Sequence, residues 1–266
     1  MSRMPTLFIS HGSPMLAIED TPARVFLQGL GETLPRPRAI IVFSAHWESI
    51  GGPAVSLATQ PETIHDFGGF PDALYAIQYP ATGAPAVAMQ AASLLEQAGY
   101  TVRRSDTRGL DHGAWVPLRL MYPAADVPVT QISLLRDASP EEHEKLGRTL
   151  SSLRDEGVLV IGSGSLSHNL SEFRGHHIDA EVPAWVNEFS DWMNAALSEG
   201  RRADVLDYRR KAPHAVRNHP TEEHLLPLFV AMGAGGAGPS GEGVQTQRIH
   251  SSVEYGVLAM DVYAFS

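Results

Sequence analysis

The sequence predicts an α/β fold, a single domain with a central, mostly parallel sheet flanked by helices. Three observations support this prediction. Short apolar runs rich in β-branched residues alternate along the chain with amphipathic stretches of helical length. The chain of 266 residues suits one α/β domain spanning 1–266. No internal repeat or long linker divides it.

The strand predictions rest on short apolar segments, which are typical of strands buried on both faces of a parallel sheet. The predicted strands are Thr6–Ser10, Ala39–Ser44, Val127–Leu134, Val158–Ile161 and Val257–Phe265. Ligands of open α/β sheets bind in the crevice beyond the carboxyl ends of the strands. We therefore expect the functional site at that edge of the sheet.

Three stretches carry helix signals. Pro85–Ala98 opens with a proline suited to the first helical position and ends before Gly99. Pro140–Leu153 has acidic residues in its first turn. Pro183–Leu197 is amphipathic, and we expect its aromatic residues in the core rather than at a cofactor.

Composition narrows the function classes. The formal net charge of -10 argues against nucleic-acid or anionic membrane partners. Met1–Ser10 has no signal-peptide pattern, and no apolar stretch approaches membrane-spanning length, so we expect a cytoplasmic protein. No glycine-rich phosphate loop follows a strand, and Gly233–Gly243 is interpreted as a surface loop. Because there is no cysteine, any metal must be bound by His, Asp or Glu.

Three histidines follow predicted strands at the point where each strand ends. These are His11, His46 and His168. A lone histidine in such a place is more often a hydrogen-bonded structural residue. Three similar placements weaken that interpretation, because side chains at the carboxyl ends of parallel strands can meet although they are far apart in sequence.

Two further segments are candidates for the same site. In the first, Asp111 could orient the ring of His112, and Gly113 could permit close approach of a substrate. The alternative is that Asp111 only caps a helix. The second, His219–Leu228, is interpreted as a capped helix start with His224 one turn in. An unpaired imidazole at the core boundary would be costly, and a metal ion would satisfy it.

The predicted chemistry is that of a mononuclear, imidazole-rich metal centre. Ligands of this type suit Fe(II), Zn(II), Cu(II) or Ni(II) and do not distinguish between them. A neighbouring histidine with a pKa near the working pH could act as general acid or base, and His168 and His112 are the candidates.

The chain resembles the class III extradiol ring-cleavage dioxygenases, most closely their DOPA-dioxygenase-like branch. The resemblance covers almost the whole length and is carried by six motifs in order. They are His11–Pro14, Ser44–Trp47, Ile64–Pro71, Asp111–Trp115, Ser167–Leu170 and Pro220–Leu228.

This resemblance implies a non-haem Fe(II) enzyme that uses O2 to open a catechol ring beside its two hydroxyls. His11, His46 and His224 would be metal ligands. His168 would be a fourth ligand in a resting or zinc-loaded form, or the acid/base near bound substrate. His112 would contact the substrate. The expected substrate-binding residues are His65, Asp66, Phe67 and Ser13. His65 and Asp66 would either line the pocket or support the residues behind it, and Phe67 and Phe70 would form aromatic walls. The alternative for His65, Asp66, Phe67 and Phe70 is ordinary structural packing.

The sequence departs from the broader class, which uses two histidines and a carboxylate, because its third segment offers His224 after Glu222 and Glu223. An all-histidine set would also bind zinc well. Two other functions therefore stay open. One is a zinc hydrolase with Glu222 or Glu223 as base, and the other is a non-catalytic metal-binding relative with an occluded pocket.

Overall fold

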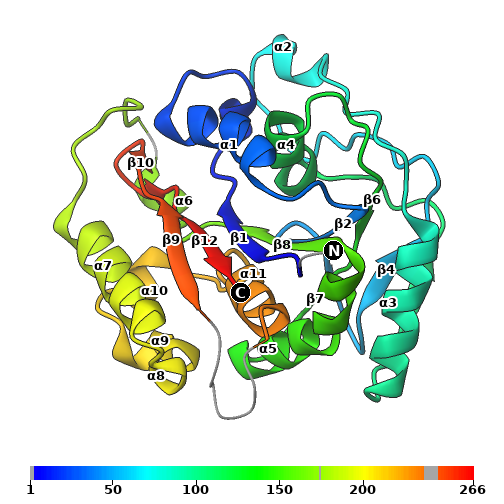
Figure 1. Cartoon of the computed structure of the whole chain (residues 1–266). Coiled ribbons are helices and arrows are strands. Elements are labelled where there is room, and N and C mark those ends of the chain that lie inside the picture. Colours follow the sequence, from blue (N-terminus) through cyan, green and yellow to red (C-terminus); the bar gives the residue numbers. More distant parts are fainter. Residues whose placement is uncertain (1–2, 174, 237–244) are drawn as a thin grey trace.

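The computed structural model describes residues 3–173, 175–236 and 245–266 (Figure 1). Its centre is a six-stranded sheet with the strand order β6-β2-β8-β1-β12-β9. The strands of this sheet are β1 (Thr6–Ser10), β2 (Ala39–Ser44), β6 (Val129–Gln131), β8 (Val158–Gly164), β9 (Thr246–His250) and β12 (Val262–Phe265). Three strand pairs lie outside it: β3 (Glu48–Ser49) with β7 (Leu134–Leu135), β4 (Ala54–Ser56) with β5 (Arg103–Ser105), and β10 (Val253–Glu254) with β11 (Leu258–Ala259).

The main sheet is mostly parallel, as predicted. β8 pairs in parallel with both β1 and β2, and β2 pairs in parallel with β6. Only β12 runs against its neighbours, β1 and β9. β1, β2 and β8 are buried along their whole length, which explains why their sequences are continuous apolar runs rather than alternating ones.

Helices cover both faces and both ends of the sheet (Figure 1). They are α1 (Pro22–Thr33), α2 (Asp72–Tyr75), α3 (Pro85–Gln97), α4 (His112–Met121), α5 (Pro140–Thr149), α6 (Leu170–Phe173), α7 (Ala184–Ser198), α8 (Arg202–Leu206), α9 (Tyr208–Lys211), α10 (Ala215–Asn218) and α11 (Leu226–Ala234), with 3-10 turns η1 (Pro14–Ala17) and η2 (Ser151–Glu156). α11 packs on β8 and β1 and is covered by α5, whereas α4 and α1 lie on the other face. α3 contacts β6, and α7 contacts β9. The buried apolar residues form one continuous core.

The predicted strand ends differ from the structure where the chain changes partners. Thr6–Ser10 and Ala39–Ser44 match, and β8 runs on to Gly164. Val127–Leu134 divides into β6 and β7, because after Ile132 the chain leaves β2 and pairs with β3. The last predicted strand likewise divides into β11, which closes a hairpin with β10, and β12, which joins the main sheet.

The predicted helices form with small shifts in their ends. α3 and α7 lie within one residue of the predicted bounds at each end, and α5 ends at Thr149, where the chain tightens into η2. Within the predicted loop Gly233–Gly243, helix α11 continues to Ala234, and residues 237–243 lie outside the described part of the chain. In the three described ranges, no helix has the length and apolar character needed to span a membrane.

The predicted helix start before His224 is wrong. His224 lies in a turn, and α11 begins at Leu226. Pro227 explains the difference, because proline has no amide hydrogen and is tolerated only in the first turn of a helix. A helix that began near Thr221 would place this proline in its interior.

Candidate metal centre

Three histidines from remote segments meet at the carboxyl edge of the sheet. His11 directly follows β1, His46 lies two residues after β2, and His224 lies just before α11. Nε2 of His11 and Nε2 of His46 are 3.0 Å apart. The ring of His224 is centred 5.6 Å from that of His11 and 5.0 Å from that of His46. One ligand atom from each of the three lies within 4.8 Å of the others.

The end of β8 holds two of these residues in place. The carbonyl oxygen of Gly164 accepts the backbone N–H of His11 at 2.8 Å. The next amide, that of Ser165, donates to the carbonyl of His224 at 2.8 Å. A Cβ at Gly164 would lie 2.0 Å from that carbonyl oxygen, so only glycine lets the His224 turn approach the strand.

Two successive hydrogen bonds, through the carbonyl of Gly113 and the hydroxyl of Ser163, determine which ring nitrogen of His11 carries the proton. Pro117 lies inside α4 and has no amide hydrogen for the carbonyl of Gly113, four residues earlier. That carbonyl instead accepts the hydroxyl proton of Ser163. The oxygen of Ser163 lies 3.0 Å from Nδ1 of His11. Because the hydroxyl proton is already donated in the hydrogen bond to Gly113, this oxygen accepts a hydrogen bond from Nδ1–H of His11. Nε2 of neutral His11 is thus left with a free lone pair.

A carboxylate does the same for His224. Oε1 of Glu223 lies 3.0 Å from Nδ1 of His224 and accepts a hydrogen bond from Nδ1–H. Nε2 of His224 is buried and has no hydrogen-bond partner. Burial lowers the pKa of His224 well below its ordinary value, with the nearby His168 adding to the effect. Burial alone would raise the pKa of Glu223, but the hydrogen bond and charge of His224, together with hydrogen bonds from the backbone and from Thr221, lower that pKa to about 2.

Burial also keeps His11 and His46 neutral. Burial and the neighbouring His46 lower the pKa of His11 well below its usual value. Burial and the neighbouring His112 lower the pKa of His46 to about 4, although Asp111 and Asp66 oppose the shift. Neutral imidazoles with free lone pairs are the form that binds a metal ion.

This arrangement fits a divalent metal ion. Nε2 of His11, which carries no proton, lies 3.0 Å from Nε2 of His46. Nε2 of His224 is a buried acceptor without a donor. Three imidazole nitrogens are a borderline donor set that binds Fe(II) or Zn(II). Ser163 and Glu223 are the hydrogen-bond partners that such ligands usually have on their other nitrogen.

Gly113 lets α4 approach the two ligand rings. A Cβ at this position would lie 2.4 Å from the hydroxyl of Ser44, and 3.1 Å from a ring carbon of His11 and from one of His46. The prediction that this glycine makes room for a substrate is therefore wrong, because the room is taken by the histidines.

Asp66, rather than Asp111, orients His112. Oδ1 of Asp66 lies 2.9 Å from both the backbone nitrogen and Nδ1 of His112. Asp111 caps α4 by accepting from the amide of Ala114, and its carboxylate also accepts from Ser44, Gln131 and Arg108. The helix-cap interpretation of Asp111 is correct. Burial favours a higher pKa for Asp66, but hydrogen bonds from His112 hold it below the ordinary range.

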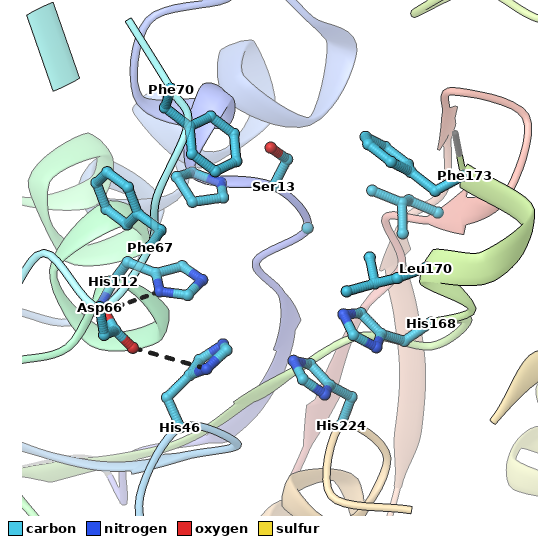
Figure 2. Close-up of a pocket in the computed structure, with 13 residues that line it drawn as sticks. Ser13, His46, Asp66, Phe67, Phe70, His112, His168, Leu170, Phe173 and His224 are labelled. Atoms are coloured by element: carbon cyan, nitrogen blue, oxygen red, sulfur yellow. Dashed lines mark hydrogen bonds and ion pairs between the residues drawn. The ribbon is translucent and has the colours of Figure 1, made fainter. Parts of the chain in front are cut away.

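A cavity of about 250 Å³ opens beside the three histidines. Figure 2 shows His46 and His224 at its base, His112, Phe67 and Phe70 on one side, and His168, Leu170 and Phe173 on the other. The lining residues are Gly12, Ser13, Pro14, His46, Asp66, Phe67, Phe70, His112, His168, Leu170, Phe173, His224 and Leu258. The occluded pocket expected of a non-catalytic relative is not present among the described residues.

All but one of the predicted pocket residues line the cavity. Ser13, Asp66, Phe67 and Phe70 line the cavity. His65 does not: its Nε2 lies 3.0 Å from the carbonyl oxygen of Ile77, and its ring packs behind Phe67. Sequence reasoning did not assign a role to Phe173 or Leu258. Leu170 stood in one of the six motifs but received no role either.

His168 lies in the cavity wall against His224. The two rings are stacked, with centroids 3.5 Å apart and planes inclined by 7°. Burial lowers the pKa of His168 to about 4, and the nearby Glu223 only partly opposes this. His168 is therefore neutral near pH 7 and has a nitrogen able to accept a proton.

Neither glutamate is free to act as the base of a hydrolase. Glu223 is bonded to His224 and to the hydroxyl of Thr221. Glu222 accepts the hydroxyl proton of Tyr208 at 2.8 Å. Neither side chain lines the cavity. No contact of these two residues favours the zinc hydrolase.

Known proteins resemble this chain over nearly its whole length. A family model described as the catalytic LigB subunit of aromatic ring-opening dioxygenase matches residues 5–258. A 4,5-DOPA dioxygenase extradiol from Beta vulgaris is 43% identical over 265 residues, which are 98% of this chain and 96% of that protein. The protein of the same name from Escherichia coli strain K12 is 42% identical over 236 residues, or 88% of this chain and 86% of that protein.

The fold is shared with a solved structure. The crystal structure of an uncharacterized protein from Escherichia coli K12 matches with a TM-score of 0.80 and 33% sequence identity, covering 98% of this chain and 99% of that one. The predicted resemblance is thus confirmed by both sequence and structure. The chain belongs to the LigB family of aromatic ring-opening dioxygenases and is a metal-dependent enzyme of the extradiol type.

Proposed function

We propose that this enzyme uses Fe(II), held by His11, His46 and His224, to open the ring of a catechol with O2 beside its two hydroxyls. The observation that carries the proposal is the convergence of three imidazoles at the base of a cavity, with Nε2 of His11 and Nε2 of His46 3.0 Å apart and Nε2 of His224 buried without a partner. The choice of Fe(II) follows from the reaction rather than from the ligands, because three imidazoles would also bind Zn(II).

The cavity suits a single aromatic ring with a short substituent. Its volume of about 250 Å³ lies just below the roughly 300–1,000 Å³ of pockets for drug-sized ligands. Phe67, Phe70 and Phe173 offer aromatic faces for packing against a ring. Because the relatives from Beta vulgaris and Escherichia coli are named as DOPA dioxygenases, DOPA is the first catechol to test.

Catalysis would divide between the metal and the side chains around the cavity. Fe(II) held by His11, His46 and His224 would supply open coordination positions and the one-electron chemistry that a reaction of a catechol with O2 requires. The aromatic walls exclude water and orient the ring. His112 would contact the substrate, and neutral His168 would accept a hydroxyl proton and later return it.

The geometry favours His168 as acid/base rather than ligand. Each imidazole binds a metal through a lone pair in the plane of its ring. Because the rings of His168 and His224 are stacked 3.5 Å apart with nearly parallel planes, their lone pairs lie in parallel planes and do not converge on one point. One ligand atom each of His168, Glu223 and His224 lies within 4.8 Å of the others, but the stacked rings support the acid/base role for His168.

The test is anaerobic loading with Fe(II), followed by addition of L-DOPA or 4-methylcatechol and then O2. A yellow product that has gained the mass of one O2, with one O2 consumed per catechol, is the expected result. His177→Ala, which replaces an exposed histidine outside the site, is the control and should form the same product as the parent protein. No product with iron, together with hydrolysis of an ester or amide by the zinc-loaded protein, would refute the proposal. The cytoplasmic location stays a prediction from the sequence.

A further inference from the structure

Asp66 joins two histidines of the centre through its two carboxylate oxygens. Oδ1 lies 2.9 Å from both the backbone nitrogen and Nδ1 of His112. Oδ2 lies 3.7 Å from Nδ1 of His46. Figure 2 shows both contacts, with the ring of His112 extending from Asp66 toward the cavity.

These contacts determine which nitrogen of His112 carries the proton. An ionised carboxylate oxygen only accepts hydrogen bonds, so Nδ1 of His112 must be the donor. In the neutral ring, Nε2 then has a free lone pair. The bond to the backbone amide of the same residue fixes Oδ1 at the start of α4, so the carboxylate has little freedom to release the ring.

We propose that Asp66 is a positioning residue for ring opening, which holds Nε2 of His112 as a hydrogen-bond acceptor for a catechol hydroxyl. The inference rests on the proposed function of the site. A hydroxyl that binds beside the metal needs an acceptor to take its hydrogen bond. With the other tautomer, Nε2 of His112 would carry an N–H and would offer no acceptor for the hydroxyl proton, and Nδ1 would face the carboxylate of Asp66 without a proton to donate.

A purely structural role for Asp66 is distinguishable from this one. If Asp66 only anchored the start of α4, it would do so through the backbone amide of His112, which remains in His112→Ala. Adding Asp66→Ala to that variant would then cause a second loss. If Asp66 acts through the ring, the double variant should be no worse than His112→Ala alone.

The first measurement is made without iron. Ring ¹⁵N NMR of the metal-free protein should show His112 with Nδ1 protonated, the signal being assigned by its loss in His112→Ala. Asp66→Ala should shift the proton between the two nitrogens, whereas Asp66→Asn, which keeps an oxygen acceptor, should restore most of the Nδ1–H form. Unchanged His112 shifts in Asp66→Ala would overturn the inference.

The second measurement is turnover of the iron-loaded protein. Asp66→Ala and His112→Ala should each lower kcat about 10–100-fold, and the double variant should fall no further. Asp72→Ala, which removes an exposed charge from the same region, is the control and should retain parental kcat. Additive losses in the double variant would contradict the inference. If the parent protein opens no catechol, the proposed function fails, and the NMR result alone decides the role of Asp66.

Discussion

The hydroxyl of Ser163 lies 3.0 Å from Nδ1 of His11 and leaves Nε2 as the ring nitrogen through which that histidine can bind a metal ion. Because Ser163 donates to the carbonyl of Gly113, it accepts from His11 and leaves Nε2 unprotonated. The serine is therefore a partner of the metal centre although it lies outside the cavity lining. Its position depends on Pro117, which leaves the Gly113 carbonyl without a helical donor.

Ser163→Ala should weaken metal binding by about 10–100-fold, the usual effect of removing a hydrogen-bond partner of a ligand. Without the hydroxyl, the proton of His11 is no longer held on Nδ1. The measurement is a competition titration with a chelator of known affinity. Ser133→Ala removes another buried hydroxyl, which bonds to Ser49 and to the amide of Ala54 and to none of the three histidines, and should lose stability without losing metal affinity. Equal affinities in the two variants would contradict the prediction.

Gly113→Ala should both destabilise the protein and lower its metal content. The added Cβ would lie 3.1 Å from ring carbons of His11 and His46, so the rings or the helix must move. Such overpacking typically costs about 1–3 kcal/mol of unfolding free energy. Gly29→Ala in α1 meets nothing within 4 Å and should instead stabilise the fold, by about 0.5–1 kcal/mol. Denaturant titrations and metal analysis of both variants provide the test.

The central sheet and the convergence of the three histidines could be predicted because both follow from local signals. Apolar runs marked β1, β2 and β8, and parallel pairing places their carboxyl ends at one edge. His11 and His46 were therefore predictable as neighbours. His224 is a candidate from its place at the core boundary and a ligand by the resemblance, but the helix expected around it does not form.

The partners behind these histidines could not be predicted, since they depend on packing between remote segments. The resemblance implies a pocket or supporting role for Asp66 but not its pairing with His112, because the two residues lie 46 positions apart and nothing local in either segment indicates the contact. Asp111, the sequence neighbour of His112, was the natural choice for orienting it and was the wrong one. Ser163 reads only as part of a glycine- and serine-rich strand end, and its role appears once α4 packs against β8.

His11→Ala, His46→Ala and His224→Ala should each abolish tight, stoichiometric metal binding, because each removes one of three primary bonds. Metal content after dialysis, measured by elemental analysis, is the direct test. His177→Ala changes an exposed histidine and should keep the parental stoichiometry. A variant of the first three that retains one tightly bound ion per chain would remove that residue from the ligand set.

His168→Ala should lower turnover far more than metal content if His168 is the acid/base, by about 10²–10⁴-fold in kcat. Its stacking on His224 gives the physical reason to expect retained metal. Metal analysis and steady-state kinetics on the same preparation separate the two roles. Loss of metal in proportion to activity would instead make His168 a ligand.

Acid should destabilise the fold through His219, a buried histidine outside the proposed ligand set. Nε2 of His219 donates to the carbonyl of Leu166 at 2.9 Å, and Nδ1 is buried without a partner. Burial lowers its pKa from 6.5 to about 4. The unfolded chain therefore binds a proton at this residue at a higher pH than the folded one. The stabilisation is complete above pH 6.5 and is lost as the pH falls from 6.5 toward 4.

For one such group, lowering the pH from 7 to 5 should reduce the unfolding free energy by about 2 kcal/mol. His219→Gln keeps a donor for the Leu166 carbonyl but takes up no proton, so its stability should depend less on pH over this interval. The measurement is urea unfolding of metal-free protein at several pH values, which avoids competition between protons and the metal. His177→Gln alters an exposed histidine and should retain the parental dependence. If His219→Gln retained the full parental slope, the acid sensitivity would have to come from other buried histidines, such as His143, whose pKa is also lowered by burial.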